Sequence, residues 1–363
     1  MLNKKYQRYF YHALPFGITW LVFALIYALL EYGFIGVLDH YPATGNPYSF
    51  KMTMQYPVVG SFLTGLFQGL VEVIWLRRIF ESKPLWVKIV VKSAFYLSLI
   101  ILFLVGVSMV ASAILNETTV FDTIVLTEVK DFISAFAFWS IVIYMAIIIN
   151  LALAFSEIKE YFGGDTFYSF LLGKYHTPNQ ETRIFMFLDM KSSTSIAERL
   201  GHERYFELIK KYYSDMTQPI LETSGVIYQY VGDEIVVCWF EKKGLYRNNC
   251  IECFRKISET IHKHKDDYME SFGLVPEFKA GYHIGEVTTG EIGIIKKDII
   301  YTGDVLNTTA RIQGECNKYD ARVLISENLL NKLILGNDFR VSEIATLQLR
   351  GKNTPTKLFS IAF

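Results

Sequence analysis

Hydrophobic positions divide the chain into two halves with different patterns. Before about residue 155, apolar residues continue almost without interruption through four segments, each long enough to cross a bilayer as a helix. These segments cover residues 13–30, 56–76, 93–115 and 132–155. The sequence therefore predicts an N-terminal transmembrane domain over residues 1–155, with all-α structure and a lipid bilayer as its surroundings.

The second half has the polarity of an ordinary globular domain, which we place at residues 181–363. Short apolar stretches alternate there with helical periodicity, a pattern typical of an α+β fold with one antiparallel, ferredoxin-like sheet and helices packed against it. Its first elements are a strand over 183–189 and helical periodicity over 194–223. The later ones are strands near 276–286 and 298–302, a helix over 304–317, the strand "ARVLIS" and a C-terminal strand pair.

Residues 156–180 join the two halves, and we interpret them as a juxtamembrane connector. Gly163 and Gly164 interrupt this stretch, and Pro178 ends any helix before the second domain begins.

Basic residues close to the apolar segments predict how the chain crosses the membrane. Basic side chains concentrate before the first segment and between the second and third, whereas the loops at 39–55 and 116–130 hold one lysine each. Because such residues stay on the cytoplasmic side, both termini and the second domain are expected in the cytoplasm of a cell whose inner membrane holds the chain. The basic residues are Lys4, Lys5, Arg8, Arg77, Arg78, Lys83, Lys88 and Lys92.

One carboxylate, Glu72, falls inside the second apolar segment, with Gln68 one turn before it. An intramembrane carboxylate is a candidate for a functional role. Its position close to the cytoplasmic end favours a simpler interpretation, in which Glu72 reaches Arg77 or Arg78.

Composition and cysteine spacing exclude several classes of function. The chain has 363 residues, 51% of them hydrophobic, with 36 basic and 36 acidic side chains, so no net field favours nucleic acid as a partner. Cys250 and Cys253 form a CxxC in an apparently amphipathic helix, and no second pair completes a zinc site. We expect them to be reduced core thiols, as we do Cys238 and Cys316.

Candidate chemistry begins at the stretch "RIFMFLDMKSSTSIAERLG", residues 183–201, where Asp189 ends an apolar strand. A second acid, Asp233, lies in the tight turn of the predicted hairpin "VIYQYVGDEIVVCWF". If the two strands are neighbours, the carboxylates converge, and no basic partner for either is apparent. Two such acids repel unless a cation lies between them, and oxygen ligands suit Mg²⁺ or Mn²⁺. The residues after Asp189 offer backbone N–H groups to a phosphate at a helix start.

A third element is "YTGDVLNTTARIQ", in which Asn307 and Arg311 are four residues apart on a predicted helix and share a face. Such a pair can hold a ribose and a phosphoryl group. A solvated helix face is the alternative, and those two residues alone do not exclude it.

Together these three elements resemble the class III nucleotide cyclase catalytic domain, over about residues 180–363. The resemblance lies in the order and spacing of "FMFLDMKSSTSIAERLG", "YQYVGDEIVVCWF" and "GDVLNTTAR". The hairpin "VGDEIVV" is also similar to that of diguanylate cyclases, but those enzymes do not need the Asn307–Arg311 element.

The resemblance implies a set of site residues and a reaction. Asp189, Asp233 and the Met190 carbonyl would bind two Mg²⁺ or Mn²⁺ ions, and Asn307 and Arg311 would stabilise the transition state. The ribose 3′-oxygen of ATP would attack the α-phosphate and release pyrophosphate, in active sites shared between the two chains of a homodimer. The residues implied to bind phosphate are Lys191, Ser192, Ser193, Thr194 and Arg350, the last standing where the family usually has a lysine.

Base selection departs from the family pattern. Adenylate cyclases usually have Lys, and guanylate cyclases Glu, where this chain has Gln229. The second selecting position aligns with Ile300, which cannot form a hydrogen bond with a purine, although Thr302 lies on the same strand face. ATP is the expected substrate, with GTP or loose purine selection as the alternative. A membrane sensor with a degenerate cyclase module is the non-enzymatic alternative.

Overall fold

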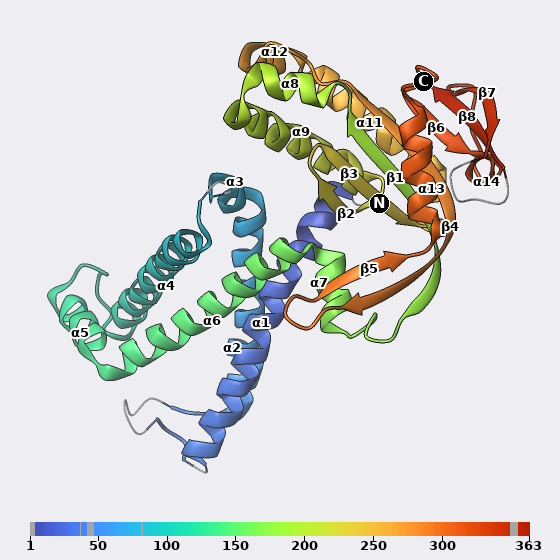
Figure 1. Cartoon of the computed structure of the whole chain (residues 1–363). Helices are drawn as coiled ribbons and strands as arrows, with labels where there is room; N and C mark the ends of the chain where they lie inside the picture. Colours follow the sequence, from blue (N-terminus) through green and yellow to red (C-terminus); the bar gives the residue numbers. More distant parts are fainter. Residues whose placement is uncertain (1–3, 37, 42–46, 81–82, 349–354) are drawn as a thin grey trace. The chain divides into compact units, whose positions relative to one another are not determined.

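The computed structural model of the chain describes residues 4–36, 38–41, 47–80, 83–348 and 355–363. It separates into two compact units, Met1–Gly164 and Asp165–Phe363 (Figure 1). The division falls within the stretch predicted as a connector. The predicted fold class, an α-helical membrane-type domain followed by an α+β catalytic-type domain, is confirmed.

The first unit consists of helices along the described residues. They are α1 (Lys4–Ile35), α2 (Phe50–Val71), the π-helical turn η1 (Glu72–Leu76), α3 (Arg77–Phe80), α4 (Leu85–Leu115), α5 (Thr123–Ser134) and α6 (Phe136–Phe162). Four helical stretches are long and apolar enough to cross a membrane: Tyr9–Ile35, Phe50–Leu76, Leu85–Leu115 and Phe136–Tyr161. Each overlaps one of the apolar segments identified in the sequence. The fourth segment was expected to start at 132, but the chain bends at Ala135, which has extended backbone angles and separates α5 from α6.

Glu72 belongs to a buried ionic cluster in this unit. Lys92 of α4, only 2% exposed, contacts Glu72 and lies 2.8 Å from Glu157 of α6. Lys88 lies 3.4 Å from Glu157, and the Tyr96 hydroxyl donates to Glu72 over 3.4 Å. The predicted pairing of Glu72 with Arg77 is therefore wrong, because Arg77 pairs with Glu160 instead; the side chain of Arg78, the other predicted partner, lies outside the described ones.

The reason for that error is geometric. In the π-helical turn η1 the Arg77 N–H donates to the Glu72 carbonyl, so spacing along this turn does not by itself separate the two side chains, and their partners on other helices decide the pairing. Arg77 instead lies 2.7 Å from Glu160, on α6. The partner of Glu72 comes from a different helix, whose orientation the sequence does not give.

The second unit is built on one sheet with the strand order β2-β3-β1-β4-β6-β8-β7, and β5 pairs with β4 outside this path. The strands are β1 (Asn179–Met190), β2 (Val226–Val231), β3 (Glu234–Phe240), β4 (Phe278–Ile292), β5 (Asp298–Thr302), β6 (Val323–Ser326), β7 (Arg340–Leu347) and β8 (Thr356–Ala362). The sheet is mixed rather than wholly antiparallel, because β6 runs parallel to β4. A parallel neighbour requires a crossover connection, which α13 supplies here.

Helices cover both faces of this sheet (Figure 1). One face packs against α9 and α11, and the other packs against α13. The helices of the unit are α7 (Gly164–Leu171), α8 (Ser193–Leu200), α9 (His202–Glu222), α10 (Glu241–Leu245), the 3₁₀ turn η2 (Tyr246–Asn248), α11 (Asn249–Lys263), α12 (Lys265–Phe272), α13 (Asp304–Glu315) and α14 (Glu327–Leu330). All four cysteines are buried and free, as the sequence predicted.

Replacing Lys92 with Ala should destabilise the first unit by about 3 kcal/mol, because it leaves two buried carboxylates with less positive charge than they need. Thermal unfolding of the detergent-solubilised protein, followed by circular dichroism, measures this loss. Lys130→Ala is the matched control, since Lys130 is exposed on α5. Equal unfolding temperatures for the two variants would show that the cluster contributes nothing to stability.

Candidate active site

The central strand β1 positions the first candidate residue. Ile184 to Leu188 are buried on both faces of the sheet, with Ile184, Met186 and Leu188 packing toward α9 and α11. Phe185 and Phe187 pack on the opposite side, near α13. Because side chains alternate along a strand, Asp189 points to the α13 side, where the strand reaches the edge of the core. A strand fixed on both faces holds this carboxylate in one place.

The second carboxylate comes from the neighbouring hairpin. β3 is antiparallel to β1, with Ile235 opposite Leu188, so the β2–β3 turn lies beside the end of β1. Gly232 occupies the turn with φ +62°, a left-handed conformation that favours glycine. Asp233 follows it, and its Oδ2 atom is buried without a hydrogen-bond partner among the described residues. The two strands are neighbours, as the sequence required for the two acids to meet.

The electrostatics reflect this closeness. Burial raises the pKa of Asp189 above its usual value, and the adjoining Asp233 carboxyl raises it further. Burial also raises the pKa of Glu234 to about 7, with further contributions from the negative charges of Asp189 and Asp233. Burial and neighbouring negative charge therefore oppose the ionisation of Asp189 and Glu234 in this region.

Two residues that partly offset this charge were missed at the sequence level. Lys279 is directly opposite Asp189 in the β1–β4 register, and its Nζ lies 3.5 Å from Asp189 Oδ2. Gln313 of α13 donates to the same Oδ2 over 3.1 Å. The expectation that neither acid has a basic partner is thus wrong for Asp189. Lys279 stood in a recognisable strand, but only the register between strands reveals which residue it faces.

The carboxylate pair suits a hard divalent cation. One Asp233 oxygen has no hydrogen-bond partner among the described residues, and the pKa of Asp189 is raised. Both side chains offer oxygen ligands, which Mg²⁺ and Mn²⁺ prefer. Among the residues that the structure describes, no three His, Cys, Asp or Glu side chains gather in a metal-binding group. Further ligands would therefore have to be main-chain oxygens, such as that of Met190, water or substrate phosphates.

The turn after β1 leads into a helix start with open donors. Ser192 is left-handed (φ +56°, ψ +30°) and precedes α8 without capping it by its side chain. The first N–H groups of the helix, including those of Ser193 and Thr194, are available because no residue of the helix itself can accept from them. Lys191 is directed elsewhere: its N–H donates to the Glu277 carbonyl over 2.8 Å, and its Nζ lies 3.7 Å from the Glu277 carboxylate.

Helix α13 carries Asn307 and Arg311 and packs closely on β4. A Cβ at Gly281 would lie 2.3 Å from the backbone nitrogen of Gln313, so only glycine permits this approach. The buried positions of α13 include Val305, Ile312 and Gln313.

Asn307 and Arg311 do not converge with the carboxylates of the same chain. Asn307 is exposed, and Arg311 is half-buried with its Nη1 atom unpartnered among the described residues. Gln313 faces Asp189, and Arg311 lies about 200° away from it around the helix. Within one chain, Asn307 and Arg311 therefore lie on a different side of α13 from Gln313, the residue that contacts Asp189.

Three of the remaining predicted residues lie on strands: Gln229 on β2, and Ile300 and Thr302 on β5. Gln229 is exposed on β2, directly after an irregularity in the β2–β3 register at Tyr228. Ile300 is half-buried on β5, and the Thr302 hydroxyl donates to the Thr288 carbonyl over 3.2 Å. Arg350 lies outside the described residues.

Comparisons with known proteins agree with this arrangement. Residues 175–361 match the family model described as the adenylate and guanylate cyclase catalytic domain. The chain is 36% identical over 205 residues to adenylate cyclase 2 of Rhizobium meliloti (strain 1021), covering 56% of each protein. It is 24% identical over 186 residues to the adenylate cyclase of Anabaena cylindrica, covering 48% of this chain and 36% of that protein. The chain thus spans about half the length, or less, of these curated relatives.

Among solved structures, a bacterial light-regulated adenylyl cyclase shares the fold with a TM-score of 0.53 and 15% sequence identity. The superposition covers 63% of this chain and 66% of that one. At this identity, the likeness extends to the fold alone.

In the absence of divalent cations, Asp189→Asn should raise the unfolding midpoint. Folding raises the pKa of Asp189 and of Glu234, so the unfolded state ionises first as the pH increases. The wild type therefore loses stability as the pH rises from about 4 to about 7, and the variant escapes much of this loss. Melting in EDTA at pH 5 and pH 7.5 should show a larger advantage for the variant at pH 7.5.

Asp215→Asn is the matched control for this measurement. Asp215 lies 3.6 Å from the Lys211 Nζ and accepts a hydrogen bond from the Tyr268 hydroxyl over 2.7 Å, so a neutral replacement loses the ion pair and should lower the midpoint. Added Mn²⁺ should raise the midpoint of the wild type but not that of Asp189→Asn. An Asp189→Asn protein that melts below the wild type in EDTA at pH 7.5 would contradict the electrostatic interpretation.

Proposed function

We propose that this chain, which belongs to the adenylate and guanylate cyclase catalytic domain family through residues 175–361, is a membrane-anchored adenylate cyclase. It would convert ATP to 3′,5′-cyclic AMP and pyrophosphate for intracellular signalling. The observation that carries the proposal is the pair of carboxylates, Asp189 and Asp233, at adjoining strand ends, one with a buried oxygen that lacks a partner.

The carboxylates and the Met190 carbonyl would hold two Mg²⁺ or Mn²⁺ ions. When bound, these ions would make the ribose 3′-hydroxyl a better nucleophile and neutralise the phosphates. Asp189 and Asp233 hold their positions because β1 and the hairpin are fixed by the core. Of the two Asp189 carboxylate oxygens, Oδ2 is the one that Gln313 and Lys279 contact in the described hydrogen bonds and ion pairs, and Lys279 also donates to Asn317 over 3.0 Å.

The other groups would bind and orient the nucleotide. The N–H groups at the start of α8, from Ser192 to Thr194, would bind phosphate oxygens, because a helix N-terminus favours negative charge. Asn307 would orient the ribose, and the Arg311 guanidinium would stabilise charge on the α-phosphate during displacement. Arg350 would contact the terminal phosphates. Lys191 contributes to this loop mainly through its backbone, since its side chain is near Glu277.

The position of α13 supports a homodimer with shared active sites. One chain supplies the carboxylates, and its own Asn307 and Arg311 are on a different side of the helix from Gln313. A second copy related by a two-fold axis would bring its Asn307 and Arg311 to these carboxylates, and the same operation would complete a second site. The exposed Asn307 and the unpartnered Arg311 nitrogen support this arrangement.

The membrane location is supported by the four long apolar helices. The distribution of basic residues in the loops favours both termini inside, which would give the catalytic domain access to cytoplasmic ATP. The protein would thus be a multi-pass protein of the inner membrane.

ATP is preferred over GTP because the curated relative with 36% identity is an adenylate cyclase. The candidate purine contacts, Gln229, Ile300 and Thr302, carry no charge that would select one base. A site of this kind discriminates poorly between purines, so we expect the specificity constants for ATP and GTP to differ by less than roughly a thousandfold.

The decisive experiment is an assay of the full chain, purified in detergent, with Mn²⁺ and either ATP or GTP. Cyclic AMP should form from ATP, and Asp189→Asn and Asp233→Asn should each reduce kcat/KM at least about a hundredfold, since the ions lose a ligand. Asp266→Asn, on the exposed surface of α12, is the control and should retain activity. Absence of any cyclic product, with the protein folded, would favour a catalytically degenerate sensor; cyclic GMP as the main product would favour a guanylate cyclase.

Shared sites predict complementation between inactive variants. Asp189→Ala and Arg311→Ala should each be inactive alone, because every site in either homodimer lacks a group. Mixed dimers contain one doubly defective site and one intact site. With random pairing, half of the dimers are mixed, so the mixture should regain roughly a quarter of the wild-type activity. An inactive mixture, after subunit exchange has been demonstrated with labelled chains, would exclude shared sites.

A further inference from the structure

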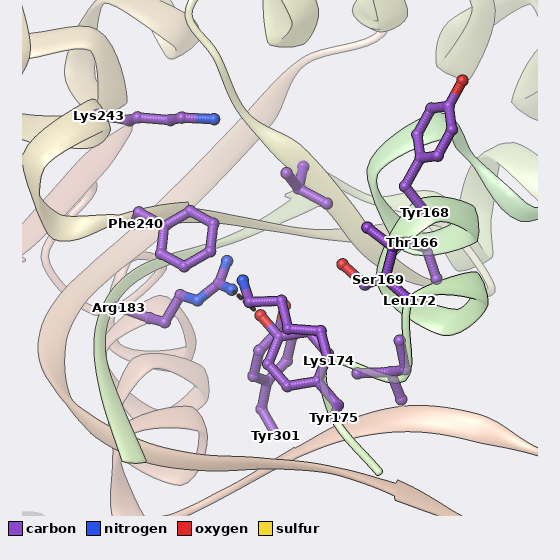
Figure 2. Close-up of a pocket in the computed structure, with 12 residues that line it drawn as sticks. Thr166, Tyr168, Ser169, Leu172, Lys174, Tyr175, Arg183, Phe240, Lys243 and Tyr301 are labelled. Atoms are coloured by element: carbon purple, nitrogen blue, oxygen red, sulfur yellow. Dashed lines mark hydrogen bonds between the residues drawn. The ribbon is translucent and has the colours of Figure 1, made fainter. Parts of the chain in front are cut away.

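The second unit contains a cavity that lies away from the carboxylates of Asp189 and Asp233. It has a volume of about 290 Å³ and is lined by residues of α7 and the loop that follows it, the start of β1, the end of β3, α10 and β5 (Figure 2). None of the residues assigned to metal, ribose or phosphate binding lines it. The cavity is thus distinct from the candidate active site.

Three cationic side chains surround one aromatic ring in this cavity. The Arg183 guanidinium carbon lies 3.5 Å from the centroid of the Phe240 ring, and the Nζ atoms of Lys174 and Lys243 lie 4.8 Å and 5.7 Å from it. Figure 2 shows the three side chains gathered around Phe240. The two lysines come from different parts of the chain: Lys174 belongs to the connector and Lys243 to α10.

The positive charge of this group is only partly balanced. Arg183 is 2% exposed and pairs with Glu181, whose Oε1 lies 2.8 Å from Arg183 Nη2. The same Oε1 also accepts hydrogen bonds from the Thr289 hydroxyl over 2.6 Å and from the Tyr175 hydroxyl over 3.3 Å, so this oxygen is shared among several donors. No carboxylate pairs with Lys174 or Lys243 among the side chains that the structure describes. Contact with an aromatic face leaves the positive charge of these two ammonium groups in place, so an anion can still pair with them.

We propose that this cavity binds a small anion of the phosphate class, held by Lys174 and Lys243 at its mouth. Each ammonium group offers three donors to phosphate oxygens, and the buried Arg183 adds positive potential from behind. Thr166 and Ser169 provide hydroxyl groups on the α7 side. The volume of about 290 Å³ accommodates a phosphate with a compact organic group. Binding links the connector to α10 and the sheet.

Phosphate of this class has two sources, a soluble phosphate ester or the headgroup of an anionic phospholipid. By chain length alone the second source is accessible, since Lys174 follows the end of α6 by twelve residues. The inference does not depend on the proposed cyclase activity, because it concerns binding at residues that the proposed catalysis does not use.

The test is a lysine footprint of the full chain in lipid nanodiscs. Acetylation rates of Lys174 and Lys243 are measured by mass spectrometry in phosphatidylcholine discs, with and without sn-glycerol 3-phosphate, at constant ionic strength maintained with sodium chloride. A parallel arm uses discs that contain phosphatidylglycerol and no soluble phosphate. Lys242, the exposed neighbour of Lys243 on α10, is the internal control.

Protection of Lys174 and Lys243, but not of Lys242, supports the site. Protection in the first arm identifies a soluble ester as a ligand, and protection only in the second identifies the lipid headgroup. Lys174→Gln should weaken the protection of Lys243 at least about tenfold, because one charge-assisted contact is lost; Lys242→Gln should not. Equal modification of all three lysines in both arms, or equal protection of Lys242, would overturn the inference.

Discussion

Repulsion between Asp189 and Asp233 is the constraint on which the catalytic unit depends. Two carboxylates stay this close only if the backbone holds them in place and if a cation can bind between them. The first condition is met by β1, which is buried on both faces, and by the adjoining hairpin paired with it. Lys279 and Gln313 reduce the cost from one side, at Oδ2 of Asp189. They leave an oxygen of Asp233 unpartnered among the described residues, which is the position that a cation needs.

Under the proposed shared-site model, the same geometry would leave one chain without a complete active site. Helix α13 must lie close to β4, through the contact at Gly281, for Gln313 to reach Asp189. This fixes the rotation of the helix, and it therefore directs Asn307 outward, about 240° from Gln313. The residues that stabilise Asp189 and those that would act on substrate occupy different faces of one helix. In the proposed homodimer, a second copy would supply the missing residues without any change in the fold.

Sequence patterns predicted the features that are determined within a single helix, strand or turn. The apolar helices, the strand that ends at Asp189 and the hairpin turn at Gly232 each have a local signature, of length, alternation or turn residue. Contacts between helices and strands have no such local signature in the sequence. Lys279 faces Asp189 because of a register, and Lys92 reaches Glu72 because of the way separate helices are rotated. The parallel pairing of β6 and the cluster around Phe240 also combine residues distant in sequence, so neither was predicted.

The two ends of the connector differ in how their charged side chains are paired. In the first unit, Glu157 and Glu160 lie three residues apart on α6 and pair with Lys92 and Arg77, from two different helices. A rotation or a sliding of α6 would have to separate at least one buried ion pair, which is costly because it leaves a charge uncompensated. Such a helix is expected to occupy discrete positions rather than a continuous range. In the second unit, Lys174 adjoins Phe240 beside a carboxylate-poor cavity. The connector therefore joins a helix whose carboxylates are paired to a loop in which Lys174 has no carboxylate partner among the described side chains.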